Sequence, residues 1–91
     1  MITAIVMIDA ETARIPETAQ ALADLDGVAE VYSCAGDVDL IAIVKVRDHE
    51  AIARVVTERI NKTPGVVRTD THIAFKSYAQ AEVDAGFHLG E

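Results

Sequence analysis

The chain has 91 residues, enough for one domain only, and 15 acidic against 8 basic side chains give a formal net charge of −7. That balance argues against an interface with nucleic-acid phosphates, which rewards basic patches. The single cysteine, Cys34, excludes an intramolecular disulfide. Without a basic leader or a run of about 20 apolar residues, the sequence predicts a cytoplasmic protein that makes no membrane contact.

The first half of the chain predicts a strand, a helix and a second strand. Residues 2–9 are short and rich in Val and Ile, as is typical of a strand. Residues 15–25 carry apolar side chains at helical spacing, and Pro16 suits the first helical turn. Gly27 ends that helix, and residues 28–35 predict the second strand.

The second half repeats this order. Residues 40–47 predict a strand, and Asp48 is a plausible N-cap for the helix that follows it. The apolar stripe of that helix consists of Ile52, Val55, Val56 and Ile60. Pro64 and Gly65 stop the helix, and residues 66–76 predict the last strand.

The two halves match each other at a spacing of 38 residues. Ala-Ile-Val at 4–6 recurs at 42–44, and Gly-Val at 27–28 recurs at 65–66. Two β-α-β units in tandem predict an α+β, ferredoxin-like β-α-β-β-α-β fold, with a four-stranded antiparallel sheet and two helices on one face.

The predicted central strands are apolar on both faces. Ile41 and Ile43, for example, point away from the face shared by Leu40, Ala42 and Val44. An antiparallel sheet with one face in water normally alternates apolar and polar residues. We therefore expect a second copy of the chain to cover this face, so that the protein is a dimer through its sheets.

Two groups of polar residues are candidate ligand contacts. Gly36-Asp37-Val38-Asp39 joins two apolar strands and predicts a hairpin turn, in which both carboxylates can accept hydrogen bonds from a ligand ammonium. Gly and Asp also occur in turns for conformational reasons alone. Thr69 and Thr71 share one face of the last strand, and Arg68, Asp70 and His72 share the other.

The sequence indicates no catalytic residue, metal ligand set or cofactor. His49, His72 and His88 fall in different elements and have no metal-ligand spacing to Cys34. Cys34 has no basic neighbour in sequence that would activate its thiol. Neither a phosphate-binding loop nor a nucleophile motif is present. We therefore do not expect an enzyme.

Five motifs together resemble the effector-binding domain of the Lrp/AsnC transcriptional regulators, also called the RAM domain, over residues 2–76. They are Gly27-Val28, Tyr32, Gly36-Asp37-Val38-Asp39-Leu40, Pro64-Gly65-Val66 and Thr69-x-Thr71. The resemblance implies sheet-to-sheet dimers that assemble into rings, often octamers, and bind amino acids or related metabolites between dimers. It also implies ligand contacts from Gly36, Asp37, Val38, Asp39, Thr69 and Thr71, although the family often has an aromatic residue where Val38 stands.

Full-length members of that family carry an N-terminal helix-turn-helix, whereas this chain starts at its first strand. The resemblance therefore implies a stand-alone sensor or modulator of transcription that does not bind DNA itself, with full-length relatives as candidate partners. We expect residues 1–77 to form the ligand-binding domain and residues 78–91 a tail or short helical arm.

Three other interpretations remain open. A small dimeric ferredoxin-like enzyme, of the monooxygenase or isomerase type, needs a His, Asn or Trp in a pocket between helices and sheet, and His72 is the strand-centred histidine. An amino-acid-binding ACT domain shares the fold but usually has a glycine in the first loop, where residues 9–14 have none. The third interpretation is a purely structural oligomerisation module.

Overall fold

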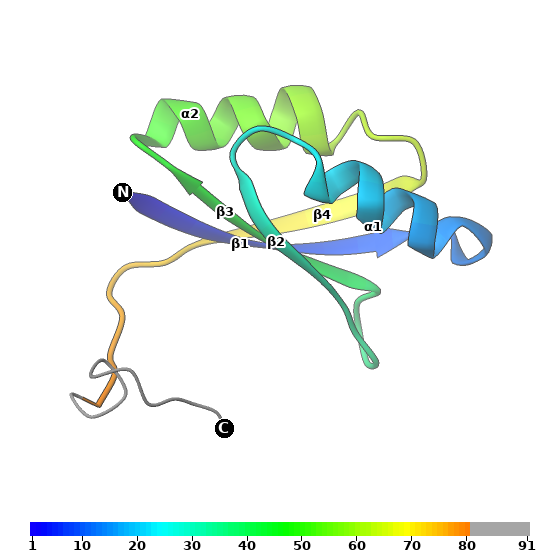
Figure 1. Ribbon diagram of the computed structural model, residues 1–91, viewed down its shortest axis with the longest axis horizontal. Helices are drawn as coiled ribbons and strands as arrows, with labels where there is room; N and C mark the ends of the chain where they lie inside the picture. Colours follow the sequence, from blue (N-terminus) through cyan, green and yellow to red (C-terminus); the bar gives the residue numbers. More distant parts are fainter. Residues whose placement is uncertain (81–91) are drawn as a thin grey trace.

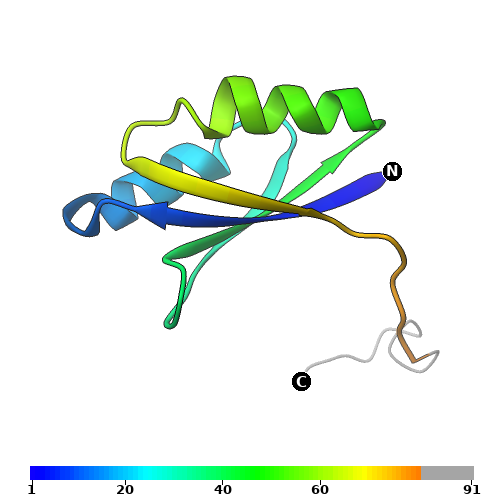
Figure 2. The same cartoon turned by 180° about the vertical axis from the view of Figure 1, so that it is seen from behind.

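The computed structural model describes residues 1–80, which form a four-stranded antiparallel sheet with helices on one face (Figures 1 and 2). In chain order the elements are β1 (Ile2–Ala10), the 3-10 turn η1 (Thr12–Arg14), α1 (Ile15–Ala23), β2 (Val28–Ser33), β3 (Leu40–Val46), α2 (His49–Arg54), its π-helical continuation η2 (Val55–Ile60) and β4 (Val66–Ile73). The strand order is β2-β3-β1-β4. This arrangement confirms the predicted ferredoxin-like fold.

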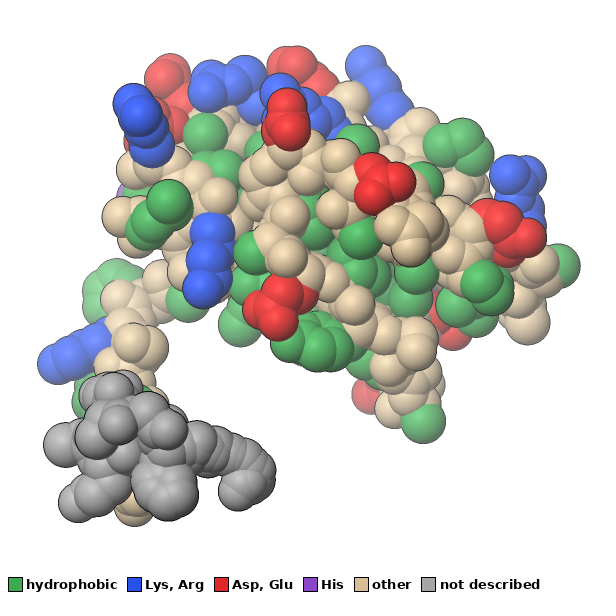
Figure 3. Space-filling model, in the orientation of Figure 1, with side chains coloured by type: hydrophobic (Ala, Val, Ile, Leu, Met, Phe, Trp, Pro, Cys, Tyr) green, Lys and Arg blue, Asp and Glu red, His purple; other side chains and the backbone are tan. Residues whose placement is uncertain are grey.

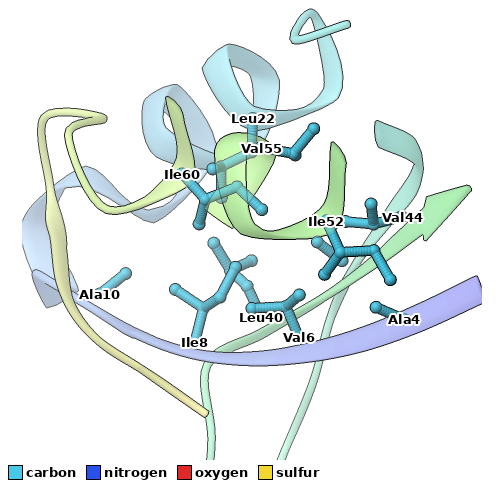
Figure 4. Close-up of a cluster of buried hydrophobic side chains, with 11 residues drawn as sticks. Ala4, Val6, Ile8, Ala10, Leu22, Leu40, Val44, Ile52, Val55 and Ile60 are labelled. Carbon is cyan, nitrogen blue, oxygen red and sulfur yellow. The ribbon is translucent and has the colours of Figure 1, made fainter. Parts of the chain in front are cut away.

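The core lies between the sheet and the helices (Figure 4). Alternate residues of the central strands point into it, and β1 and β3 are paired so that Val6 lies opposite Ala42. The helices contribute Leu22, Ile52 and Ile60, each at most 4% exposed. The fully buried strand residues are Ala4, Val6, Ile8, Leu40, Ala42 and Val44.

The second helix begins where the sequence predicts. Asp48 is the N-cap in extended conformation, and its Oδ1 accepts a hydrogen bond of 2.8 Å from the backbone N–H of Ala51. The helix changes to π-helical geometry at Val55, where Asn61 N–H donates to Val56 O at 2.8 Å. This change of helix type is not visible in the apolar spacing.

The repeat of the sequence corresponds to a repeat of turn geometry at the C-terminal ends of the two helices. Gly27 and Gly65 both have a positive φ, of 93° and 96°. The same two backbone hydrogen bonds recur 38 residues apart: Leu25 to Leu22 O and Val28 to Leu25 O, then Thr63 to Ile60 O and Val66 to Thr63 O. The first helix therefore ends at Ala23, two residues before the predicted boundary, because its last residues enter this turn.

Three strands end earlier than predicted, and for β3 the difference is one residue, since it ends at Val46. β4 ends at Ile73 rather than at residue 76, because β1, its partner, starts at Ile2 and the last backbone bond joins Ala74 N–H to Thr3 O. β2 ends at Ser33, which pairs with Leu40.

Residues 78–80 adopt no regular structure, and the rest of the predicted arm, including His88, lies outside the described residues. The predicted domain boundary after residue 77 stays a prediction. Within residues 1–80, no helix has the length and apolarity that a membrane crossing requires.

Candidate functional site

The predicted hairpin is a six-residue loop, residues 34–39, between β2 and β3. It projects to the side of the sheet opposite the helices (Figure 1). Gly36 has a φ of 125°, a backbone conformation that residues with a Cβ rarely adopt. An added Cβ at this position would meet no atom within 4 Å. The backbone conformation, rather than lack of space, is therefore what requires glycine at this position.

The carboxylate of Asp39 ties the hairpin to the end of β1. Its Oδ2 accepts a hydrogen bond of 2.8 Å from the backbone N–H of Ala10, a residue only 7% exposed. The backbone of Asp39 makes two more bonds, donating to Ile8 O at 3.0 Å and accepting from Cys34 N–H at 2.9 Å. Asp39 therefore has a structural role, which leaves its second carboxylate oxygen for other partners.

Asp37 and Val38 lie further out on the same loop. Asp37 is exposed and Val38 is half-buried, as is Asp39. Within residues 1–80, the side chain of Asp37 makes no hydrogen bond or ion pair. Of the two predicted carboxylates, Asp37 is therefore the one fully presented to solvent.

Thr69 and Thr71 lie on the helix-covered face of β4. They pair with Ile8 and with Val6, whose side chains are in the core. The hydroxyl of Thr69 donates a hydrogen bond of 2.7 Å to Oδ1 of Asn61, the residue after η2. Asp70 and His72 face the opposite side of the sheet, as predicted from alternation, and their side chains are 3.2 Å apart.

The six predicted contact residues do not converge on one cavity within a single chain. Leu40, at the base of the hairpin, and Thr69 flank Ile8 from opposite sides. With neighbouring strands about 4.8 Å apart, their backbones are separated by about 10 Å. The threonines face the helices. The hairpin projects to the other side of the sheet (Figure 2). Neither hollow described below includes any of the six.

The uncovered face of the sheet carries a broad hollow of about 910 Å³. Its floor includes the half-buried side chains of Ile5 and Ile43, and Tyr32 and Phe75 stand at its rim, 51% and 104% exposed. The Tyr32 hydroxyl donates a hydrogen bond to the Glu30 carboxylate, and the charge of this carboxylate disfavours a phenolate. Both effects raise the pKa of Tyr32 above its usual value. This face is apolar at its centre and polar at its edge.

A second hollow, of about 330 Å³, lies beside α2 and carries a group of basic residues that the sequence analysis did not single out. They are Lys45, Arg47, Arg54 and Arg59. No local sequence pattern indicates this group, because only Arg59 follows the four-residue spacing of Ala51 and Val55 on one side of the helix.

The remaining candidates for chemistry are scattered. In the described part of the chain, no three His, Cys, Asp or Glu side chains come close enough to hold a metal ion. Cys34 is half-buried, and among residues 1–80 its thiol donates to Tyr32 O alone, at 3.7 Å. His72 is exposed on the uncovered sheet face opposite Ile5, not in a pocket between helices and sheet as the enzyme interpretation requires.

The comparison with known families identifies the domain. The family model described as the Lrp/AsnC ligand binding domain matches residues 3–83. An uncharacterized HTH-type transcriptional regulator of Pyrococcus furiosus is 35% identical over 75 residues, which are 82% of this chain and 50% of that protein. A similar regulator of Pyrococcus horikoshii is 36% identical over 59 residues, 65% of this chain and 39% of that protein. This chain thus matches at most half the length of these curated relatives.

Solved structures agree with this comparison. A protein from Thermus thermophilus has a TM-score of 0.82 and 44% identity, over 88% of this chain and all of that chain. A transcriptional regulator from Neisseria meningitidis, solved in complex with L-Met, has the same fold, with a TM-score of 0.77 and 16% identity over 87% of this chain and 53% of that one. By its sequence and its fold, this chain belongs to the Lrp/AsnC ligand-binding domain family, which is regulatory rather than catalytic.

Proposed function

We propose that this chain is a cytoplasmic, non-enzymatic sensor that binds an amino acid or related small metabolite and modulates transcription without binding DNA itself. The observation that carries the proposal is the hairpin at residues 34–39. It is held rigidly at its base through Asp39, yet it presents Gly36 and Asp37 to solvent. A fixed loop with free polar groups can bind a small zwitterion at low entropic cost.

The chemistry of the loop fits a ligand with an ammonium group. Asp37 offers a carboxylate without a partner in residues 1–80, and the free oxygen of Asp39 is nearby in sequence. Thr69 and Thr71 would add hydroxyl groups for a ligand carboxylate. Because hairpin and threonines are on opposite sides of the sheet in one chain, we propose that residues of a second copy complete the site.

The uncovered sheet face supports assembly. The side chains of Ile5, Met7, Ile41 and Ile43 are only half-buried there, although a solvated face of an antiparallel sheet is normally polar. A second copy stacked on this face would remove their apolar surface from water. We propose that such dimers assemble further into rings, up to octamers, and that longer family members are candidate partners.

Isothermal titration of the purified oligomer against the twenty common amino acids tests the proposal, with light scattering to establish the assembly first. We expect heat with at least one amino acid, and at least tenfold weaker binding for Asp37→Ala. Glu58→Ala, which removes an exposed carboxylate from η2, is the matched control and should bind normally. A confirmed oligomer that gives no heat with any of the twenty contradicts the proposal.

A further inference from the structure

Half of the Lys and Arg residues of this acidic protein contribute to the lining of one hollow. Among residues 1–80, ten residues line the hollow beside α2, and these include four of the eight Lys and Arg residues of the chain. They are Lys45, Arg47, Arg54 and Arg59, and within the described part of the chain Asp48 is the only acidic residue of the lining. Figure 3 shows Lys and Arg side chains over α2, interspersed with Asp and Glu side chains. The lining of the hollow therefore contains three exposed arginines, although the chain has a net charge of −7.

The fold brings these residues together from separate elements, and because alternation along β3 directs the Lys45 side chain to the uncovered face of the sheet, the three arginines supply the charge of the hollow. Lys45 lies near the end of β3 and Arg47 in the turn after it, whereas Arg54 ends α2 and Arg59 lies in η2. The turn at Gly27 packs closely below them, because a Cβ on Gly27 would lie 2.7 Å from Cγ2 of Val55.

Two hydrogen bonds fix the walls of the hollow. Lys45 N–H donates to Gly27 O at 3.0 Å, which holds the turn against β3. Nη1 of Arg59 donates to Asp26 O at 2.9 Å, so its guanidinium is held in place while its other N–H groups stay available.

The charges of this group are not neutralised within the part of the chain that the structure describes. The ion pairs among residues 1–80 involve Arg14, Arg68 and His72, and none of the four basic residues of the hollow has a carboxylate oxygen within 4.0 Å. Asp48 uses its carboxylate to cap α2. These exposed positive charges would attract a bound anion, and most strongly at low salt.

We infer that this hollow is a binding site for a small phosphate-bearing molecule. Arginine guanidinium groups bind phosphate oxygens in bidentate pairs, and the three arginines match the two to three negative charges of a phosphate or diphosphate. A hollow of about 330 Å³ admits such a group with a small organic part.

The site is separate from the proposed effector site. Lys45 and the hairpin residue Asp39 lie at opposite ends of β3, and six residues of strand span about 20 Å. A failure of amino-acid binding would therefore leave this inference standing, and the reverse also holds.

Titrations in phosphate-free buffer at low salt test the inference, with pyrophosphate, inorganic phosphate and glycerol 3-phosphate as probes. We expect micromolar to millimolar binding of at least one probe, weakened by added salt. Arg47→Gln/Arg54→Gln should raise the dissociation constant at least tenfold. Arg14→Gln/Arg68→Gln removes two exposed positive charges elsewhere and should change it less than twofold. A thermal melt establishes whether each variant folds. If Arg47→Gln/Arg54→Gln does not fold, the single variant Arg54→Gln replaces it.

The probes also distinguish the source of the phosphate. If pyrophosphate binds most tightly, the ligand is a diphosphate. If inorganic phosphate binds most tightly, the ligand is a free anion, and if glycerol 3-phosphate does, the ligand is an organic phosphomonoester. The inference is overturned if none of the three binds, or if both double variants lose binding equally. It is also overturned if a 20-base-pair DNA duplex binds this surface more tightly than all three probes.

Discussion

Replacing Asp39 by alanine removes the acceptor that holds the hairpin to β1. The backbone N–H of Ala10 then loses its 2.8 Å partner at a residue that is only 7% exposed. A buried amide left without a partner costs about 1–3 kcal/mol. We therefore expect Asp39→Ala to lower the free energy of unfolding by about 2 kcal/mol.

Asp37→Ala is the matched control, because it deletes the same group from an exposed position on the same loop. A surface substitution of that kind changes stability by less than about 0.5 kcal/mol. Asp39→Asn keeps an acceptor oxygen, so its loss in the free energy of unfolding should be less than half that of Asp39→Ala. For a domain of this size, about 1 kcal/mol corresponds to roughly 4–8 °C in Tm, so the expected difference is easily measured.

Urea unfolding followed by far-UV circular dichroism, at one fixed protein concentration, measures these differences. Equal midpoints for Asp39→Ala and Asp37→Ala would refute the structural role that we assign to Asp39. The result also affects how binding data are interpreted. If Asp39→Ala loosens the hairpin, its loss of ligand affinity does not identify a direct contact, whereas a loss in the stable Asp37→Ala variant does.

Three further predictions concern other parts of the domain. Gly65→Ala should destabilise the domain by about 2–5 kcal/mol, since Gly65 has a positive φ and an added Cβ would overlap the Thr18 hydroxyl. Adding Thr18→Ala to that variant should restore part of the lost stability. If urea unfolding shows that the effects of the two substitutions simply add, this overlap is contradicted. The phenol of Tyr32 should titrate above pH 10, and Glu30→Gln should lower that pKa in ¹³C NMR of the ring. Because the pKa is raised in the folded state, the hydrogen bond from Tyr32 to Glu30 stabilises the fold below pH 10. This stabilisation is lost as the pH rises through the pKa of the folded state. Ile43→Asp should convert the assembly to monomers in sedimentation velocity, and an unchanged oligomer would show that the uncovered face is not the interface.

Much of the fold was predictable because the apolar periodicity of each element is local. The elements within each copy of the 38-residue repeat, the N-cap at Asp48 and the glycine turns are set by residues close in sequence, and the structure confirms them. Strand ends were less predictable, since β4 ends where β1 offers no further partner. The burial of Thr18 was also missed, because its hydroxyl partner, Pro64 O, lies 46 residues away.

The candidate site shows the same limit. Asp37 and Asp39 look equivalent in sequence, and only the position of Ala10, 29 residues away, distinguishes the anchored carboxylate from the free one. Alternation correctly separated Thr69 and Thr71 from Asp70 and His72, but it did not reveal that the threonines face away from the hairpin. The basic hollow depends on the packing of α2 against the end of β3 and the Gly27 turn, which no local pattern records.

Hydrogen exchange of the purified oligomer, with and without saturating pools of amino acids, tests the central claim most directly. The account predicts that one pool slows exchange in the hairpin at residues 34–39 and in the Thr69–Thr71 part of β4, and that exchange around Arg54 is unchanged. Identical exchange with every pool, or protection confined to segments away from the hairpin, would contradict the claim that this loop is the effector site.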